Sequence, residues 1–358
     1  MRLDTVSQKE IAGRLGMHQS TVSYILRGQR LERYSEKTRR QVLELARRLN
    51  YRPSRSARVL KGQGSRMIGV LEFDLRSASA RRCLQAACAE IAQRGYTPLP
   101  LDGNWFTLGT DSVCDILLEQ RVEGIVMIGF GDDFARRDLP RLTAARIPIA
   151  VCLGLKLPGM FQVDADRRAA FAALTRRALA AGARRPCFLG RPVTTLRNVR
   201  RAPWDEARAG FLAAARAAGA PRPITQMVKT LPERPTDFPA SGRIGMRALL
   251  ARRQPPDAVL CYNDLMAIGA LAECLEQGVR VPADIALYGF GDEDISAHLC
   301  PSLSTLRVRE DRLARKAVDT LFEALAVPAL PPDRQALLDD IFQWTQRASS
   351  PPVEGRFF

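Results

Sequence analysis

Apolar residues recur every three or four positions through the first fifty residues of the chain, which is the spacing of amphipathic helices. Ser7 and Glu10 fit the capping box of a helix start, and Gly16 can end this first helix. A second helix begins almost at once, near Gln19, and stops at Gly28. Two short helices joined by a tight, glycine-containing turn make a helix-turn-helix, a motif that places its second helix in the major groove of DNA.

A third helix and a short helical segment are predicted next. Ser35 can cap a helix that runs to Asn50, whose side chain tolerates the left-handed backbone of a helix end. This helix closes a small core over the apolar backs of the first two. The segment between Pro53 and Gly62 has room for only about seven helical residues, and a helix so short is marginal in water. We therefore expect it to fold only when something holds it.

From Met67 onward the pattern changes to apolar strands that alternate with amphipathic helices. Such alternation predicts parallel sheets that are covered by helices on both faces. The pattern starts again after residue 166, so we expect two similar α/β halves with a cleft between them, a frequent place for a small ligand. The runs predicted as strands are MIGVLEF, YTPLPL, GIVMIGF and IPIAVCL in the first half, and PCFLG, DAVLCY and IALYGF in the second.

The net charge of +16 is concentrated at the N-terminal end of the chain. Residues 1–62 hold 15 Lys and Arg but only 5 Asp and Glu, a net charge of +10, and the rest of the chain carries the other +6. A dense basic patch suits the neutralisation of nucleic-acid phosphates. A solvated basic face without a partner is the alternative.

Composition narrows the class of protein further. No apolar run approaches the ~20 residues of a membrane-spanning helix, and the first ten residues lack the apolar core of a secretory signal. The eight cysteines form no CxxC pair or zinc-type cluster, so we expect buried thiols in a reducing cytoplasm. The chain is therefore predicted to be cytoplasmic, with no membrane contact, no metal and no cofactor.

Two groups of segments resemble the lactose-repressor (LacI/GalR) family of bacterial transcription regulators. The DNA-binding end of that family is similar to EIAGRLGMHQSTVSYIL and SEKTRRQVLELARRLNYRPSRSARVLKG. Its effector-binding core, which shares its fold with periplasmic sugar-binding proteins, is similar to RRPCFLG, PDAVLCYNDLMAIGAL and VPADIALYGFGDEDISAHLCPSLSTLRV. The resemblance covers nearly the whole chain. It implies an N-terminal all-α helix-turn-helix domain with a hinge helix, then an α/β periplasmic-binding-protein-like core of two parallel-sheet subdomains.

The same resemblance sets the expected domain bounds. Within the core, the chain is expected to pass between the two subdomains near 160–165 and again near 290–305. The expected domains are the helix-turn-helix domain at 1–52, the hinge helix and linker at 53–65, the effector-binding and dimerisation core at 66–345, and a C-terminal tail at 346–358.

The second helix is the recognition helix in this family. Gln19 and Ser20, with Tyr24 about one turn further along, are expected to face base edges. Gln19 can read an adenine through two hydrogen bonds. Thr21 and Ser23 suit contacts with phosphates.

Three features depart from the family pattern around this helix. Tyr24 stands where the family usually has Arg, and His18 stands where it usually has Ser or Thr. The loop RGQRLERY is also longer than usual. The base preferences of other members therefore do not carry over to this chain.

The hinge helix is implied by the resemblance at residues 55–61. In the family it orders on operator DNA and pairs with its counterpart in the dimer, in the minor groove. Arg55, Ala57 and Leu60 are the expected DNA contacts, with Leu60 as an apolar wedge that opens a base step. A plain core leucine is the alternative for Leu60.

The effector is expected in the cleft of the core. Three positions where sugar-binding members commonly place a polar anchor read Leu153, Ala207 and Gly291, which disfavours a neutral sugar held in the usual way. Asp292 and Asp294 either replace the missing carboxylate or cap the turn that follows. The other polar residues expected at the site are Asp74, Ser77, Asn263 and Asp264.

An arginine-rich segment, RPVTTLRNVRRAPWDEARAGF, is longer here than in the family. Because a guanidinium fork matches a carboxylate, it can clamp an acidic effector such as a sugar acid. A solvated basic loop is the alternative. Trp105 and Trp204 either stack on a ligand ring or are buried for structural reasons. The arginines concerned are Arg191, Arg197, Arg200 and Arg201.

These features together predict a sequence-specific DNA-binding transcription regulator, most simply a repressor. Its affinity for palindromic operator DNA is expected to be controlled by a small effector, a carbohydrate or sugar acid, and the resemblance implies a homodimer. A solute-binding protein shares the core fold but does not explain the helix-turn-helix. An enzyme is disfavoured, because the chain has neither GxGxxG nor GxxxxGK[ST], and His18 and His298 cannot complete a nucleophile–base–acid set.

Overall fold

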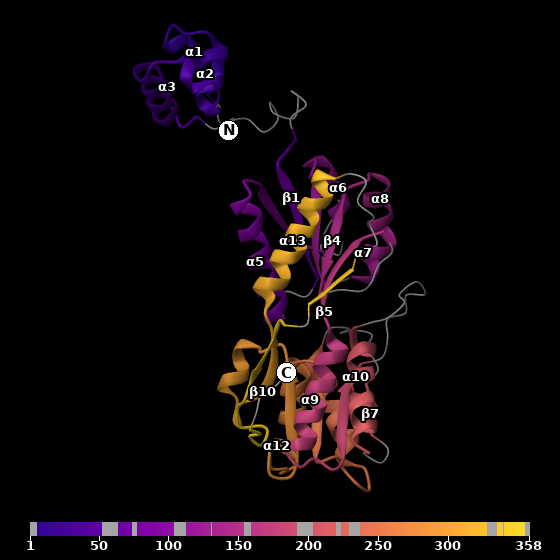
Figure 1. Cartoon of the computed structure of the whole chain (residues 1–358). Coiled ribbons are helices and arrows are strands. Elements are labelled where there is room, and N and C mark those ends of the chain that lie inside the picture. The colour runs from indigo at the N-terminus through magenta and orange to yellow at the C-terminus, as the bar shows by residue number, and fades with distance from the viewer. Residues whose placement is uncertain are drawn as a thin grey trace. The chain divides into compact units, whose positions relative to one another are not determined.

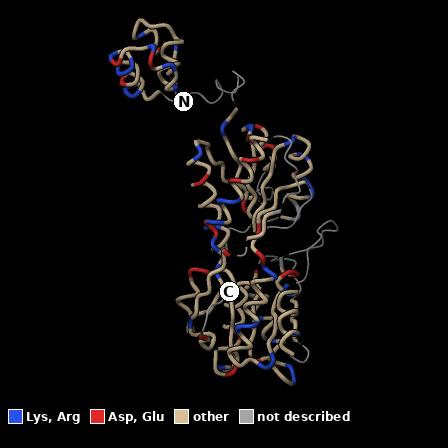
Figure 2. The backbone as a smooth tube through the Cα atoms, in the orientation of Figure 1, with Lys and Arg blue, Asp and Glu red and all other residues tan. Residues whose placement is uncertain are grey.

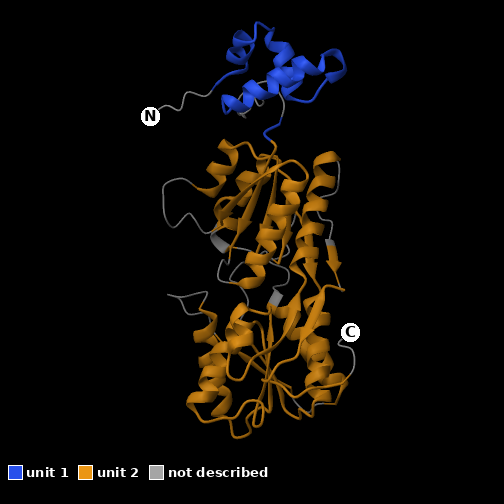
Figure 3. Cartoon of the chain, turned by 90° about the vertical axis from the view of Figure 1, so that its left-hand side faces the viewer, with its two compact units in different colours: residues 1–65 blue, residues 66–358 orange. Residues whose placement is uncertain are grey.

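The chain divides into two compact units, residues 1–65 and 66–358, and each is described by itself (Figure 3). The computed structural model describes residues 6–51, 64–73, 77–103, 112–129, 131–153, 159–191, 203–219, 223–228, 237–327, 335–338 and 340–354.

Unit 1 is a bundle of three helices around a small apolar core (Figure 1). The side chains of Ser7 and Ser35 accept hydrogen bonds from the main-chain N–H groups of Glu10 and Thr38, which confirms both predicted caps. Gly28 has a φ of +66°, the left-handed backbone that ends a helix at glycine. The elements are α1 (Gln8–Arg14), α2 (Gln19–Leu26), the 3-10 helix η1 (Leu31–Arg33) and α3 (Glu36–Arg48). The buried core residues are Ile11, Ala12, Val22, Ile25, Val42 and Ala46.

The first half of unit 2 is a parallel sheet of six strands in the order β11-β5-β4-β3-β1-β2. Alternate side chains of each strand face opposite sides: Ile125 and Met127 pack towards α6 and α8, whereas Val126 and Ile128 pack towards α5 and α13. The strands are β1 (Met67–Glu72), β2 (Thr97–Asp102), β3 (Gly124–Ile128), β4 (Ile149–Cys152), β5 (Phe161–Ala165) and β11 (Gln335–Leu338). The helices are α5 (Ala78–Gln93), α6 (Val113–Glu119), α7 (Asp132–Arg137), α8 (Leu139–Ala144) and α13 (Glu310–Ala326).

The second half is a sheet in the order β12-β10-β9-β8-β6-β7, parallel except for β12. Helix α11 packs so closely on α12 that a Cβ on Gly242 or Gly269 would overlap the main chain of the other helix. The strands are β6 (Pro186–Gly190), β7 (Ile224–Met227), β8 (Ala258–Cys261), β9 (Ala286–Phe290), β10 (Ser304–Val308) and β12 (Phe342–Thr345). The helices are α9 (Arg167–Ala180), α10 (Pro203–Ala217), α11 (Phe238–Leu250), α12 (Asp264–Glu276) and the 3-10 helix η3 (Asp294–His298). The predicted helical N-terminal domain and two-sheet core are confirmed, and the predicted hinge helix lies outside the described residues.

The chain passes between the two sheet layers after β5, after β10 and again between β11 and β12. The second passage follows Val308, later than the expected 290–305, and the third was not expected. The described part of the expected tail also packs on the second sheet: Ser349 donates a hydrogen bond to the carbonyl of Leu287 and accepts one from the N–H of Ser304. Residues 346–354 therefore form part of the core.

Some elements differ from the sequence prediction. The sequence pattern predicts a single helix over 133–146, but the structure has two short helices there that meet at Asp138, with Pro140 at the start of the second. Strands β5 and β7 were not predicted, because polar residues interrupt FQVDA and ITQM and leave no apolar run. Six of the eight cysteines are buried and none forms a disulfide, whereas Cys300 is exposed. No helix in the described ranges is long and apolar enough to cross a membrane.

Candidate DNA-binding face and effector site

Helix α2 begins at a histidine cap. The Nδ1 atom of His18 accepts a hydrogen bond from the main-chain N–H of Ser20, at 3.4 Å, and lies 2.8 Å from the Ser20 hydroxyl. His18 therefore fills the role that Ser or Thr usually has at this position. Val22 and Ile25 are buried in the core of unit 1, so the face of α2 that carries Gln19 and Ser20 is left exposed.

The predicted base-reading residues lie on or beside this face. The side chain of Gln19 makes no hydrogen bond with the described residues, so both ends of its amide are available to a partner. Tyr24 is half-buried, and the guanidinium of Arg30 lies over its ring, 4.7 Å from the ring centre. Arg30 belongs to the longer loop, and its guanidinium lies beside Tyr24, the residue that stands where the family usually has Arg. Sequence reasoning did not single it out, although the loop's extra length was visible.

The charges of unit 1 flank α2 rather than lie on it. Helix α2 contains no Lys, Arg, Asp or Glu, whereas α1, α3 and the loop that leaves α2 are rich in cations (Figure 2). Phosphate contacts position a protein on DNA, and neutral side chains with hydrogen-bonding groups read base edges. This division of charge is the one expected of a recognition helix. The flanking cations are Lys9, Arg14, Arg27, Arg30, Lys37, Arg39, Arg40, Arg47 and Arg48.

Several predicted site residues lie outside the described residues. In the hinge segment they are Arg55, Ala57 and Leu60, and in the core they are Asp74, Trp105, Arg197, Arg200 and Arg201.

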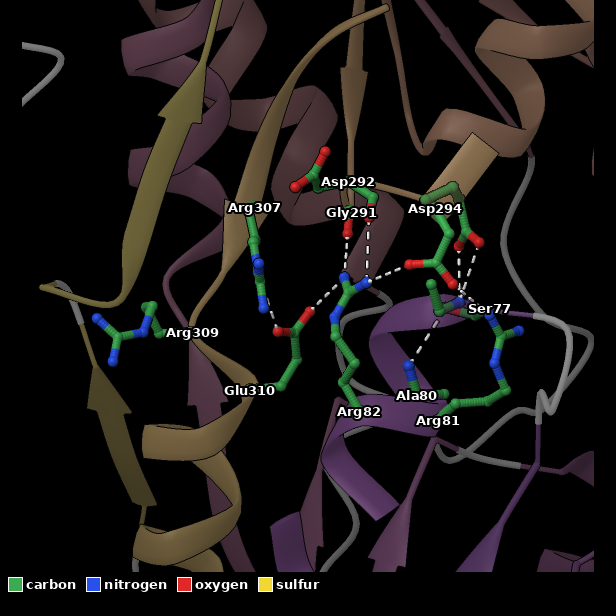
Figure 4. Close-up of polar contacts among 12 residues, drawn as sticks. Ser77, Ala80, Arg81, Arg82, Gly291, Asp292, Asp294, Arg307, Arg309 and Glu310 are labelled. Carbon is green, nitrogen blue, oxygen red and sulfur yellow. Dashed lines mark hydrogen bonds and ion pairs between the residues drawn. The ribbon is translucent and has the colours of Figure 1, made fainter. Parts of the chain in front are cut away.

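In unit 2, the start of α5 meets the segment that follows β9 (Figure 4). Ser77 caps α5 by accepting a hydrogen bond from Ala80 N–H. The main-chain N–H of Ala78 donates to the Glu293 carboxylate, and its nitrogen lies 2.8 and 3.1 Å from the two carboxylate oxygens. Glu293 is buried, and burial raises the pKa of its carboxyl although the bond from Ala78 opposes this.

Arg82 joins three segments at this boundary (Figure 4). Its guanidinium donates to the carbonyls of Gly291 and Asp292, at 2.6 and 3.1 Å, and to the Glu310 carboxylate, at 2.9 Å. Burial opposes its charge, but the hydrogen bond and the negative charge of Glu310 outweigh this and raise the pKa of Arg82. Helix α5, the loop after β9 and the start of α13 are thus held together by one side chain.

Two acids predicted to bind the effector are used within the protein. Asp264 is fully buried: one of its oxygens accepts from Thr305 Oγ1 at 2.6 Å, and the other from Glu293 N–H and Ser296 Oγ at 2.8 and 2.7 Å. Its carboxylate ties α12 to the segments after β9, and the effector-binding role of Asp264 stays a prediction. One carboxylate oxygen of Asp292 pairs with Arg347, at 2.7 Å.

The other predicted effector residues have mixed surroundings. Asn263 caps α12 by accepting from Met266 N–H at 2.9 Å. The Arg191 guanidinium lies 4.9 Å from the centre of the Phe238 ring, directly after β6. Asp294 is exposed and pairs with Arg81. Among the positions that lack a polar anchor, Leu153 has a φ of +55°, Ala207 is fully buried and Gly291 gives its carbonyl to Arg82.

Comparisons with known proteins agree with this architecture. A family model described as "Periplasmic binding protein-like domain" matches residues 175–350. The HTH-type transcriptional repressor PurR of Escherichia coli O139:H28 is 28% identical over 323 residues, 88% of this chain and 89% of that protein. The HTH-type transcriptional regulator GntR of Pseudomonas aeruginosa is 28% identical over 350 residues, 95% of this chain and 94% of its own length. Over most of its length, the chain is thus similar to transcription regulators of the LacI type.

Solved structures of such regulators show the same fold as this chain. The lac repressor dimer bound to operator and the anti-inducer ONPF has a TM-score of 0.77 and 22% identity, with 97% of this chain and 99% of that chain covered. A LacI-family regulator from Silicibacter pomeroyi has a TM-score of 0.68 and 22% identity, covering 96% and 99%. The predicted resemblance and the two-sheet core are confirmed.

Proposed function

We propose that the chain is a DNA-binding transcriptional repressor of the cytoplasm whose affinity for palindromic operator DNA is set by a small effector. The observation that carries this proposal is α2, a neutral helix with one exposed face, flanked by cations, in a chain that also has a two-sheet, binding-protein-like core. The PurR and GntR relatives are named as transcriptional regulators rather than enzymes, which supports a role without catalysis.

Operator recognition is assigned to α2, with Gln19, Ser20 and Tyr24 towards bases and Thr21 and Ser23 towards phosphates. A homodimer places two such helices on the two halves of a palindrome. The lac repressor is a dimer on its operator, and this supports the same assembly here. The hinge contacts Arg55, Ala57 and Leu60 remain predictions from the resemblance.

Effector control follows from linkage. If the effector binds better to one arrangement of the two core halves, it shifts the population towards that arrangement, and operator affinity changes by the same coupling free energy. Arg82 and Glu293 join the halves between α5 and the segment after β9, so a ligand there acts on the contacts that set this arrangement. A solute-binding protein without a DNA role remains the second candidate, favoured only by the fold of the core.

A gel-shift assay on the DNA upstream of the protein's own gene tests the function. The purified chain is expected to form a sequence-preferring complex. Its affinity should fall roughly a thousandfold between about 50 and 200 mM salt if six or more phosphates are neutralised. A scrambled sequence of equal length is the control. Equal binding to both DNAs, or no complex at low salt, would refute the proposal.

Gln19→Ala is expected to relax base preference by about 1–3 kcal/mol at one base pair in each half-site, because the amide reads a base edge. Gel shifts on a set of single-base operator variants measure this. Thr21→Ala is the matched control, and it should weaken all sequences equally. An equal loss on every sequence for Gln19→Ala would assign Gln19 to phosphate contact instead.

A further inference from the structure

Arg167, the first residue of α9, is a buried cation that has no hydrogen-bond or ion-pair partner among the described residues. The residue is only 9% exposed. None of the described residues forms a hydrogen bond or ion pair with its side chain, and its Nε atom has no acceptor. The neighbouring acid, Asp166, is occupied in capping α9 through Ala169 N–H. A buried charge of this kind destabilises a protein unless something outside the chain pairs with it.

Aromatic rings at the carboxyl ends of two strands hold this guanidinium. Its Cζ atom lies 5.3 Å from the ring centre of Phe290, the last residue of β9, and 6.0 Å from that of Tyr262, the residue after β8. Trp204 lies edge-on to Tyr262, with the ring centres 5.7 Å apart, and its Nε1 has no acceptor either. Small ligands of α/β sheets bind beyond the carboxyl ends of the strands.

The two unpartnered groups share one chemical requirement. The Arg167 guanidinium and the Trp204 Nε1–H group can donate hydrogen bonds but cannot accept them. Each therefore needs a hydrogen-bond acceptor as its partner. Cation–π contacts with two rings fix the position of the guanidinium but leave its hydrogen-bond donors unused. A carboxylate or a phosphate offers two oxygens to a guanidinium fork and supplies the missing negative charge.

We propose that Arg167 binds an anionic group, a carboxylate or a phosphate, of the effector, and that Trp204 Nε1 is a further donor at the same site. This inference rests on the proposed function and names its ligand class: an acid rather than a neutral sugar. It moves the anion-binding role from the arginine-rich segment 191–201, where the sequence suggested it, to an arginine that the sequence left unmarked.

Two variants of the full-length chain test the role of Arg167. Arg167→Met removes the charge and keeps the length of the side chain, whereas Arg168→Met makes the same change at the exposed neighbour. Without ligand, Arg167→Met is expected to raise Tm by about 2–6 °C, because an uncompensated buried charge is lost. Arg168→Met should leave Tm within about 1 °C. A lower Tm for Arg167→Met would show a structural role and overturn the proposal.

Ligand response is measured as the change in Tm with D-glucose, D-glucuronate, D-glucose 6-phosphate or inorganic phosphate, at equal ionic strength. The wild type and Arg168→Met are expected to be stabilised by at least one anion and not by glucose, and Arg167→Met should lose this response at least tenfold in apparent affinity. The glucuronate and phosphate arms separate a carboxylate from a phosphate ligand. Equal responses of wild type and Arg167→Met, including none in either, would overturn the proposal.

Operator gel shifts on the same three proteins separate the two proposals. Intact operator binding without an anion response specific to Arg167 refutes the anionic effector alone. If the wild type shows no preference for the operator over scrambled DNA, the proposed function is refuted, whatever the Tm values are. A response to the anion in Tm together with a change in operator affinity, both absent in Arg167→Met, supports both.

Discussion

Replacing Arg82 with alanine is expected to lower the free energy of unfolding of unit 2 by about 3–5 kcal/mol, the usual effect of removing one partner of a buried ion pair. The Glu310 side chain is only 2% exposed, and it keeps a single, longer contact with Arg307 at 3.6 Å when Arg82 is lost. The carbonyls of Gly291 and Asp292 lose a donor as well. Urea unfolding followed by circular dichroism measures the difference.

Arg81→Ala is the matched control. Arg81 is the preceding residue of the same helix, and its contact with Asp294 is exposed on both sides, with side chains 40% and 78% exposed. Surface pairs of this kind contribute about 0–1 kcal/mol. Should Arg81→Ala destabilise unit 2 as much as Arg82→Ala, the effect would come from the helix and not from the buried contacts of Arg82. Arg82→Lys, which keeps the charge but not the fork, is expected to fall between alanine and the wild type.

Arg82 also bears on control by the effector. Because it connects α5 of the first half with the loop after β9 of the second, its loss makes other arrangements of the two halves less costly. Under conditions where Arg82→Ala remains folded, operator affinity should depend less on effector than in the wild type, since both states become more equally populated. An unchanged dependence would limit Arg82 to stability.

The helices of unit 1 could be predicted from the sequence because their ends are marked locally. Ser7 and Ser35 cap helices through groups only three residues away, and Gly28 ends one by its own backbone freedom. The core strands β1, β3 and β8 were likewise visible as apolar runs buried on both faces. Local signals of this kind need no knowledge of the rest of the fold.

The C-terminal part of the core could not be predicted in the same way. Strand β11 pairs with β5, and β12 with β10, so the chain is shared between two sheets after Val308. These pairings join segments up to about 170 residues apart in sequence, and nothing in the local pattern of QALL or FQWT indicates which sheet each strand enters. The burial of Ser349 follows from the same distant packing.

The important arginines escaped the sequence analysis for a related reason. Arg82 follows Arg81, and Arg167 precedes Arg168, and each pair looks like a solvated basic stretch. In both pairs one arginine lies inward and the other is more exposed. Apolar periodicity does not mark the inward one, because its partners or neighbouring rings come from the loop after β9 or the ends of β8 and β9. Only the tertiary structure brings these groups together.

Asp264→Ala is expected to lower the free energy of unfolding by about 2–4 kcal/mol, because it leaves the Glu293 N–H and the hydroxyls of Ser296 and Thr305 without their acceptor in a fully buried site. Urea unfolding measures this. Asn263→Ala, next to it, is the control and should cost about 1 kcal/mol as a lost helix cap. A cost for Asp264→Ala no larger than that of the cap would contradict the role of Asp264 as a structural tie.

Asp264→Asn separates the tie from a ligand contact and has a defined dependence on pH. Burial raises the pKa of Asp264 above its ordinary value, so its contribution to stability is present at low pH and is lost as pH rises through the raised pKa. Asparagine does not titrate, and the stability gap between wild type and Asp264→Asn should therefore narrow as pH rises. If Asp264→Asn instead left stability unchanged at every pH and abolished the effector response, the Asp264 carboxylate would be assigned to effector binding. A narrowing gap with an intact effector response places Asp264 in the framework that holds Glu293 against α5, and leaves recognition of the ligand to groups such as Arg167.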